Sequence, residues 1–241
     1  MKLCFSFTFL SILLLTLAGY GQDASEFVDR GNAKSKRNDF RGAIADFSRA
    51  IAIDPKDEYP YYARGFAKEN LNEHTGAIAD FTRCIDQAPG GSVYTLYSYL
   101  WRGAAKENLG DHKGAIADYS RAIEINHGEV RAYHNRGMIK VLIRDYRGAA
   151  ADYTKAVEIN PKYSDAWYNR AIARGYLQDH RGAVADYTKA IEIDHRNAEA
   201  YYGRGVAKFN LGQKESACVD FNKSRELGYA GANEAIRNYC R

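Results

Sequence analysis

The stretch GAIADYSRAIEINH, residues 114–127, occurs six times in closely similar form along the chain of 241 residues. The copies begin at Gly42, Gly76, Gly114, Gly148, Gly182 and Ser216. Successive starts are 34 residues apart, except for the 38 residues between the second and third copies. A fixed period of this size is typical of proteins built from stacked structural repeats. The sequence therefore predicts one elongated repeat domain.

The second half of each copy has the pattern of an amphipathic helix. In the copy from Gly114, the small or apolar residues fall on one side of a helix: Ala115, Ile116, Tyr119, Ala122 and Ile123. Three of the copies end in proline, at Pro55, Pro89 and Pro161. Because proline cannot continue a helix, these positions predict where the second helix ends.

The first half of each copy is also periodic, with an aromatic residue followed four positions later by a small one. The aromatic column is Phe27, Tyr61, Tyr99, Tyr133, Trp167 and Tyr201, and the small column is Gly31, Gly65, Gly103, Gly137, Ala171 and Gly205. Glycine costs about 1 kcal/mol relative to alanine within a helix, so a glycine column indicates that two helices approach closely. Each repeat is predicted to be a helix–turn–helix unit that buries its apolar faces only against neighbouring units.

The pattern resembles the tetratricopeptide repeat. The residues that carry the resemblance in one copy are Trp167, Ala171, Ala183, Tyr187 and Ala190, followed by His195 where proline is usual. Proline is also replaced at His127 and Tyr229, and the column Arg30, Arg64, Arg102, Arg136, Arg170 and Arg204 stands where leucine is commoner. The resemblance implies an all-α, right-handed superhelical solenoid of six repeats with a C-terminal capping helix.

The boundaries follow from the period. The repeats are placed at residues 24–57, 58–95, 96–129, 130–163, 164–197 and 198–231, with the capping helix at 232–240, in a domain of residues 22–241. The 38-residue spacing places four extra residues near Pro89–Trp101, which either lengthen the third repeat's first helix or form a loop.

Residues 1–21 have the layout of a secretory signal peptide, with Lys2, an apolar run from Leu3 to Ala18, and then Gly19 and Gly21. The run of 16 residues is shorter than the roughly 20 that span a bilayer, so we expect cleavage after Gly21. Ala18 is a second candidate cleavage site, and an uncleaved anchor is the alternative. The prediction is an exported protein, periplasmic or extracellular, with no stable membrane span after cleavage.

Export leaves three cysteines in the mature chain, Cys84, Cys218 and Cys240, in a compartment that permits disulfides. Cys218 lies on the last repeat's second helix, and Cys240 ends the capping helix that the resemblance implies. We therefore expect Cys218 and Cys240 to pair, and Cys84, in a column of small residues, to remain a buried thiol.

The arginine column has an acidic companion 16 residues later in every repeat: Asp46, Asp80, Asp118, Asp152, Asp186 and Asp220. This pattern predicts a ladder of charge pairs, each worth about 0–1 kcal/mol if exposed. The alternative interpretation is a basic strip that binds an anionic ligand. The net charge of +4 is small and gives no case for nucleic-acid binding.

The sequence offers no pattern for catalysis, a cofactor or a metal. His74, His112 and His180 recur in the turns of different repeats. Neighbouring helices are already about 8–10 Å apart, whereas a zinc–histidine bond measures about 2.0–2.1 Å, so we expect no metal site. There is no phosphate-binding glycine loop, HExxH, GxSxG or CxxC motif. The prediction is a protein without enzymatic activity or cofactor.

The resemblance places the first helices along a concave groove. Carried over by position, the groove residues are Tyr59, Tyr62, Phe66, Tyr97, Leu100, His134, Met138, Leu142, Tyr168, Ile172, Tyr176, Tyr202, Val206 and Phe209. They are mostly aromatic and aliphatic, unlike the lysines and asparagines with which family members grip a terminal carboxylate.

An aromatic groove favours burial of an apolar segment of a protein or peptide partner. The sequence therefore predicts a non-catalytic binding scaffold of the cell envelope or extracellular space. A module that binds carbohydrate or an envelope polymer, and an enzyme accessory protein, are the alternatives. The superhelix burying these side chains itself, and self-association through the groove, also remain open.

Overall fold

The computed structural model describes residues 23–240, which form thirteen α-helices and no strand. The all-α prediction is confirmed. The described residues gather into two compact units, where the sequence predicts one elongated domain: unit 1 ends at Gly110 and unit 2 begins at Asp111. The predicted signal peptide, residues 1–21, lies outside the described residues. Within the described part, no helix is both long enough and apolar enough to cross a membrane.

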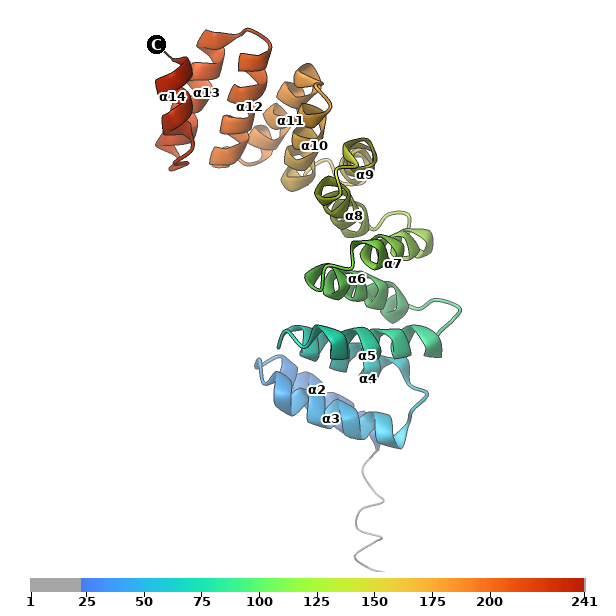
Figure 1. Cartoon of the computed structure of the whole chain (residues 1–241). Coiled ribbons are helices and arrows are strands. Elements are labelled where there is room, and N and C mark those ends of the chain that lie inside the picture. Colours follow the sequence, from blue (N-terminus) through green and yellow to red (C-terminus); the bar gives the residue numbers. More distant parts are fainter. Residues whose placement is uncertain (1–22, 241) are drawn as a thin grey trace, which may run out of the picture. The chain divides into compact units, whose positions relative to one another are not determined.

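Unit 1 contains the blue to green helices of Figure 1: α2 (Ala24–Ser35), α3 (Phe40–Ile53), α4 (Glu58–Glu69), α5 (His74–Gln87) and α6 (Val93–Asn108). Each helix packs against the next one in the chain, and the first helices α2, α4 and α6 also contact one another in sequence. This is the predicted pairing of helix–turn–helix units.

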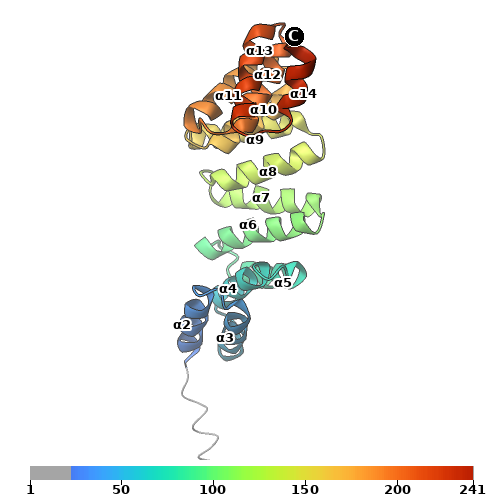
Figure 2. The same cartoon turned by 90° about the vertical axis from the view of Figure 1, so that its left-hand side faces the viewer.

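Unit 2 contains α7 (His112–Ile125), α8 (Val130–Leu142), α9 (Tyr146–Ile159), α10 (Ser164–Tyr176), α11 (His180–Ile193), α12 (Ala198–Asn210), α13 (Lys214–Glu226) and α14 (Ala232–Tyr239). Consecutive helices again pack together, and α10 contacts both α8 and α12 (Figure 2). The last helix, α14, packs against α13 in the place expected of the capping helix.

The four extra residues near Pro89 change the start of the third repeat. Helix α6 has 16 residues and begins at Val93, a few residues before the approximate repeat boundary at residues 95–96. Ser92 sets the earlier start, because its Oγ accepts hydrogen bonds of 3.1 Å from the backbone N–H groups of Tyr94 and Thr95. The insertion therefore lengthens the helix at its N-terminus.

The glycine that opens the repeated phrase belongs to a helix cap. Asp145 lies three residues earlier, and its Oδ1 accepts a 2.9 Å hydrogen bond from the Gly148 N–H. A Cβ at Gly148 would collide with the same carboxylate, so the cap requires glycine there. The equivalent pairs are Asp39 with Gly42, Asp111 with Gly114 and Asp179 with Gly182.

The second aromatic column forms the core. Phe47, Phe81, Tyr119, Tyr153, Tyr187 and Phe221 are each no more than 7% exposed. A Cβ built at Gly137 would lie 2.8 Å from Tyr153 Cε1, and one at Gly205 would lie 2.7 Å from Phe221 Cε1. The close approach predicted from the glycine column is confirmed, because the ring occupies the space that a side chain would need.

The first aromatic column is less buried than the second. Trp167 and Tyr201 are only partly buried, although the sequence pattern places both in packing columns. Each ring instead lies beneath the arginine three residues later, with 4.6 Å from the Arg170 guanidinium carbon to the Trp167 ring centroid. The equivalent distance from Arg204 to Tyr201 is 5.4 Å. These rings therefore pack by a cation–π contact at the edge of the core.

A disulfide joins the last two helical segments. Cys218 of α13 and Cys240, just after α14, are bonded across a Cα–Cα distance of 5.6 Å, which is the pairing expected from the sequence. The bond holds the terminal helix, which has a neighbour on one side only. Cys84 is a free and fully buried cysteine, as expected.

The Cys84 thiol is expected to resist alkylation in the folded protein. Burial raises its pKa to about 11, and the thiolate is the reactive species. Brief treatment with iodoacetamide at mildly alkaline pH, followed by peptide mass spectrometry, should leave Cys84 unmodified in buffer and modify it in urea. Rapid alkylation in buffer would contradict the buried position.

Candidate functional site

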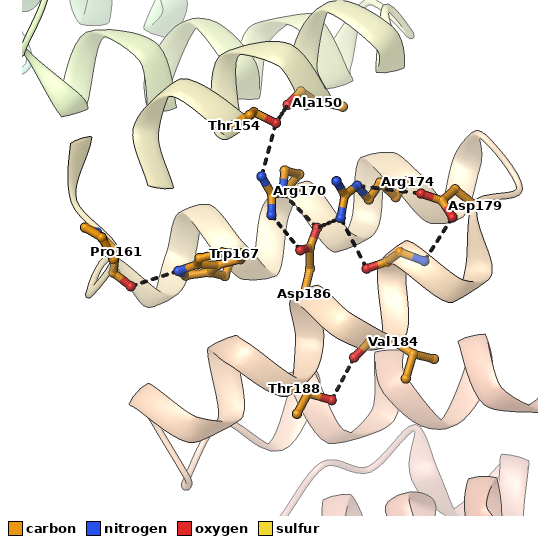
Figure 3. A network of polar contacts seen from close by, with 11 residues as sticks. Ala150, Thr154, Pro161, Trp167, Arg170, Arg174, Asp179, Val184, Asp186 and Thr188 are labelled. Carbon is orange, nitrogen blue, oxygen red and sulfur yellow. Dashed lines mark hydrogen bonds and ion pairs between the residues drawn. The ribbon is translucent and has the colours of Figure 1, made fainter. Parts of the chain in front are cut away.

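In each repeat whose two helices lie in one unit, a buried aspartate of the second helix lies between two basic side chains of the first helix. Each such group of three side chains is called a rung below. Asp186 accepts hydrogen bonds from Arg170 Nε at 2.8 Å and Nη2 at 2.7 Å, and from Arg174 Nη1 at 2.8 Å (Figure 3). Its side chain is only 2% exposed. The same arrangement is formed by Arg30, Lys34 and Asp46; by Arg64, Lys68 and Asp80; by Arg136, Lys140 and Asp152; and by Arg204, Lys208 and Asp220.

The arginine of the rung also reaches the preceding repeat. Arg170 Nη1 donates to Thr154 Oγ1 at 3.1 Å, and that hydroxyl donates in turn to the Ala150 carbonyl at 2.7 Å. The equivalent donor–acceptor pairs are Arg64 with Ser48, Arg102 with Thr82, Arg136 with Ser120 and Arg204 with Thr188. One guanidinium thus connects its own second helix to the second helix of the repeat before it.

The predicted charge pairs are confirmed at Asp46, Asp80, Asp152, Asp186 and Asp220. Because these aspartates are buried, the range of about 0–1 kcal/mol for exposed pairs does not apply to them. The arginine donors are directed to groups of the protein, which argues against the basic strip for an anion. Sequence analysis missed the second basic column, although it recurs four residues, about one helical turn, after each arginine. It also missed the hydroxyl column, two residues after the aspartate in each of the first five repeats.

The rung at Asp46 should make the stability of the fold decrease at acidic pH. The hydrogen bond from Arg30, helped by Lys34, lowers the pKa of Asp46 to about 2. A lowered folded-state pKa contributes stability above the unfolded value of about 3.9, and this stability is lost as pH falls from there toward 2. Thermal melts at a series of pH values should show a midpoint that falls through this window. The Asp46→Asn variant should have a lower melting temperature at neutral pH, and its melting temperature should depend less on pH between about 3.9 and 2. An unchanged pH dependence would contradict the assignment to Asp46.

In unit 1 the predicted groove residues form an aromatic cluster between α4 and α6. Tyr59 and Tyr62 lie 4.9 and 5.6 Å, centroid to centroid, from the ring of Tyr94, and Tyr97 lies 6.4 Å from Tyr62. Leu100 is a correction, because it is only 6% exposed and belongs to the core.

The sequence interpretation also missed two aromatic residues of this face. Tyr94 joins the cluster through the lengthened start of α6, and Trp101 contacts Phe66 edge-on with 5.1 Å between the ring centroids. Tyr94 lies in the stretch that the insertion lengthens, and the residues equivalent to Trp101 are Asn135, Asn169 and Gly203, so the repeat pattern gave no aromatic signal at either position.

In unit 2 two further predicted groove residues are corrected. His134 is 8% exposed and lies against the rings of Tyr153 and Tyr163, and this burial lowers its pKa. Phe209 packs on Tyr239 of the capping helix with 4.3 Å between the ring centroids. Both side chains serve packing.

Met138 and Leu142, by contrast, are 39% and 61% exposed. Together with Val141, Tyr153, Asn169 and Ile172 they line a small hollow of about 200 Å³ between α8 and α10.

The principal cavity of unit 2 lies between α10 and α12 and is called the tyrosine pocket below. It measures about 410 Å³, and five predicted groove residues line it: Tyr168, Ile172, Tyr176, Tyr202 and Val206. The sequence interpretation missed its other walls, which include Tyr187, Tyr229, Glu199 and Gly203. Tyr229 stands at a position where the family pattern has proline, so that departure was the available signal.

Gly203 makes room for one wall of this cavity. The core ring of Tyr187 packs over Gly203, where any Cβ would collide with the phenol end of the ring. The equivalent residue of α10 is Asn169, whose Nδ2 lies 3.0 Å from His134 Nε2 and fills the space between α8 and α10. A glycine in place of the asparagine admits the Tyr187 ring as a wall of the tyrosine pocket.

The tyrosine pocket is aromatic and carries a carboxylate at its rim. The Tyr168 hydroxyl donates to Glu199 Oε2 at 3.2 Å. Burial raises the pKa values of Tyr168, Tyr187 and Tyr202 above their ordinary value, so their phenols are neutral at physiological pH. The described residues that line this cavity include no lysine or arginine. Within residues 23–240, no group of three His, Cys, Asp or Glu side chains is placed to hold a metal ion.

Solved structures of low sequence identity share this fold. The C-terminal part of a TPR repeat-containing protein from Cytophaga hutchinsonii matches with a TM-score of 0.75 and 18% identity, covering 87% of this chain and 86% of that one. YrrB, described as a TPR protein with an unusual peptide-binding site, gives 0.65 and 21%, covering 78% and 94%. MamA gives 0.65 and 22%, covering 76% and 94%. The comparison with curated proteins gives no match.

Family models match along most of the chain. Models described as tetratricopeptide repeat match residues 59–90, 96–127, 130–163, 152–185 and 198–227, and one described as TPR repeat matches residues 31–72 and 176–212. These matches cover the same helix pairs that the structure describes. The chain belongs to the tetratricopeptide repeat family.

Proposed function

We propose that the chain is a non-catalytic scaffold that binds a protein or peptide partner in the tyrosine pocket. The observation that carries the proposal is the cavity of about 410 Å³ between two first helices, lined by five tyrosines. Tyrosine combines a large apolar ring with a polar end that stays hydrated, and it is enriched at energetically important positions of interfaces. The peptide-binding site named for YrrB is in keeping with this use of the fold.

The non-catalytic part of the proposal rests on how the charged columns are used. The buried aspartates are fully engaged by two basic side chains each, as at Asp186 and Asp220. A carboxylate held in this way is a structural group rather than a general base. The remaining lining of the tyrosine pocket is aromatic, aliphatic or glycine, apart from Glu199, His180 and Asn210.

We also propose that the protein acts outside the cytoplasm. Support comes from the signal-peptide layout of residues 1–21 and from the Cys218–Cys240 disulfide, a bond favoured in oxidising compartments. Mass spectrometry of protein from its native host should find Gln22 or Gly19 as the first residue. Intact Met1 in the soluble cytoplasm would overturn this location.

Replacing both Tyr168 and Tyr202 with alanine is expected to weaken partner binding by about 2 kcal/mol or more, if both rings are hot spots. The test applies purified protein to arrays of peptides and of glycans, and then measures the affinity of the selected ligands for the variant. Tyr201→Ala is the matched control, since Tyr201 is adjacent to Tyr202 but lies under Arg204 and does not line the pocket.

Three outcomes would count against the proposal. Binding that is lost equally in Tyr201→Ala would show that the effect comes from unfolding. Selection of glycans alone would favour the carbohydrate-binding alternative. Unchanged binding in the Tyr168/Tyr202 variant would place the site elsewhere.

A further inference from the structure

We propose that the tyrosine pocket accepts the side chain of a lysine or arginine from the bound partner segment, an inference that rests on the proposed function. Three properties of the cavity support this proposal: the arrangement of its rings, its charge, and the combination of apolar lining residues with a carboxylate.

The rings surround the cavity at different angles. Tyr168 and Tyr187 meet edge to face, with 62° between their planes and 5.8 Å between their centroids. Tyr202 and Tyr229 are inclined by 50° at 5.0 Å. These inclined rings line one open hollow from α10, α11, α12 and the segment after α13, so that their π faces are not parallel. Such faces attract a cation electrostatically, and aromatic cages for ammonium groups are built in this manner.

The lining of the cavity holds one carboxylate and no lysine or arginine, and His180, whose Nε2 lies 3.1 Å from Gln178 Oε1, also belongs to it. Glu199 is the carboxylate at the rim, and its Oε2 is already held by the Tyr168 hydroxyl at 3.2 Å. The basic side chains of α10 and α12 are engaged elsewhere: Arg170 and Arg174 contact Asp186, and Arg204 and Lys208 contact Asp220. An incoming cation therefore meets a carboxylate, neutral phenols and the His180 imidazole, whereas an anion would meet the carboxylate without a compensating lysine or arginine.

The floor of the cavity fits the rest of a long basic side chain. Ile172 and Val206 occupy equivalent positions on α10 and α12 and line the pocket together with Ala183 and Ala207. Lysine and arginine bury their aliphatic stems on apolar surface while their charged heads stay at a polar group. The volume of about 410 Å³ lies toward the lower end of the roughly 300–1,000 Å³ of ligand pockets, which suits one side chain with some adjoining backbone.

Gly203 is the residue that makes the site specific to this pair of repeats. In α10 the corresponding Asn169 contacts His134, and the hollow there is only about 200 Å³. We therefore expect one basic side chain to be bound here rather than one in every repeat.

The test uses small probes of defined chemistry. Purified protein with isotope-labelled tyrosine is titrated by NMR with N-acetyl-lysine methylamide and N-acetyl-arginine methylamide. N-acetyl-norleucine methylamide serves as the uncharged analogue, and N-acetyl-glutamate methylamide as the anionic one. The basic probes should shift the ring signals of Tyr168 and Tyr202 saturably and bind about tenfold more tightly than norleucine.

Two variants connect the effect to the carboxylate. Glu199→Gln should weaken the basic probes by about fivefold or more, with no change in the norleucine affinity. Glu192→Gln is the matched control, because Glu192 is an exposed glutamate of α11 that pairs with Lys189 and does not line the cavity. Circular dichroism should show both variants to be folded.

The outcomes separate this inference from the function on which it rests. The inference of a basic side chain would be overturned if the norleucine and lysine probes bound with equal affinity, or if the glutamate probe bound more tightly than the lysine probe. It would also be overturned if chitotriose, a glycan, displaced the lysine probe at a concentration below that of the lysine probe. If the peptide array still selects ligands whose affinity depends on Tyr168 and Tyr202, the proposed function stands without it. If the lysine probe binds but no peptide does, the proposal that the bound cation belongs to a peptide or protein partner is overturned.

Discussion

Replacing Asp186 with alanine is expected to lower the free energy of unfolding by about 3–5 kcal/mol, because it removes one partner of a buried charge cluster. Arg170 is 7% exposed and donates two hydrogen bonds to this carboxylate, and Arg174 donates a third. Without Asp186, the buried Arg170 guanidinium keeps its hydrogen bond to Thr154 and its contact with the Trp167 ring, but no carboxylate. Urea unfolding followed by circular dichroism measures the loss, and hydrogen exchange of α10 and α11 shows whether it is local.

The matched control is Lys189→Ala on the same helix. Lys189 pairs with Glu192 at 2.7 Å, the same length as the Arg170–Asp186 contact, but both side chains are more than half exposed. This pair should contribute less than about 1 kcal/mol. Similar losses in the two variants would show that burial does not set the strength of the rung.

A double replacement tests whether the unpaired buried charge causes the loss of stability. Changing both Arg170 and Asp186 to leucine should recover much of the stability lost in Asp186→Ala, since no unpaired charge is then buried. Arg174 keeps a carboxylate partner at Asp179, 3.7 Å away. A double variant that is less stable than Asp186→Ala would contradict this account.

Replacing Tyr153 with alanine is expected to cost about 3–5 kcal/mol, the range for loss of a large aromatic ring from a core. Tyr153 is 1% exposed, and its ring occupies the space beside Gly137 that a side chain would otherwise fill. Glycine cannot refill that space, so a cavity remains. Urea unfolding gives the difference.

Tyr133→Ala is the control within the same repeat. Tyr133 is partly buried, and its ring centroid lies 5.8 Å from the Arg136 guanidinium carbon. Its cation–π contact is worth about 0.5–1 kcal/mol at an exposed site, so the loss should be clearly smaller than for Tyr153. A larger loss at Tyr133 would show that the first aromatic column, and not the second, forms the core.

The sequence by itself determined the helices, their order and the roles of the repeated columns. Because the sequence repeats every 34 residues, equivalent positions have the same surroundings, and the role of a residue in one copy predicts the role of its equivalents in the others. The 16-residue offset between arginine and aspartate was enough to predict their pairing, and the family resemblance was enough to predict the Cys218–Cys240 bond. These features lie within one repeat or between adjacent segments, where helical geometry fixes which residues face one another.

Only the tertiary structure decided which groove residues are buried and where a cavity opens. Helical periodicity places Leu100, His134 and Phe209 on the same face as Tyr168, but exposure depends on the side chains that a neighbouring helix brings against that face. The tyrosine pocket exists because Gly203, Tyr187 and Tyr229 come together from three separate segments. The Tyr187 ring can lie there only because Gly203 has no side chain, and this fit appears only when the two helices are packed together.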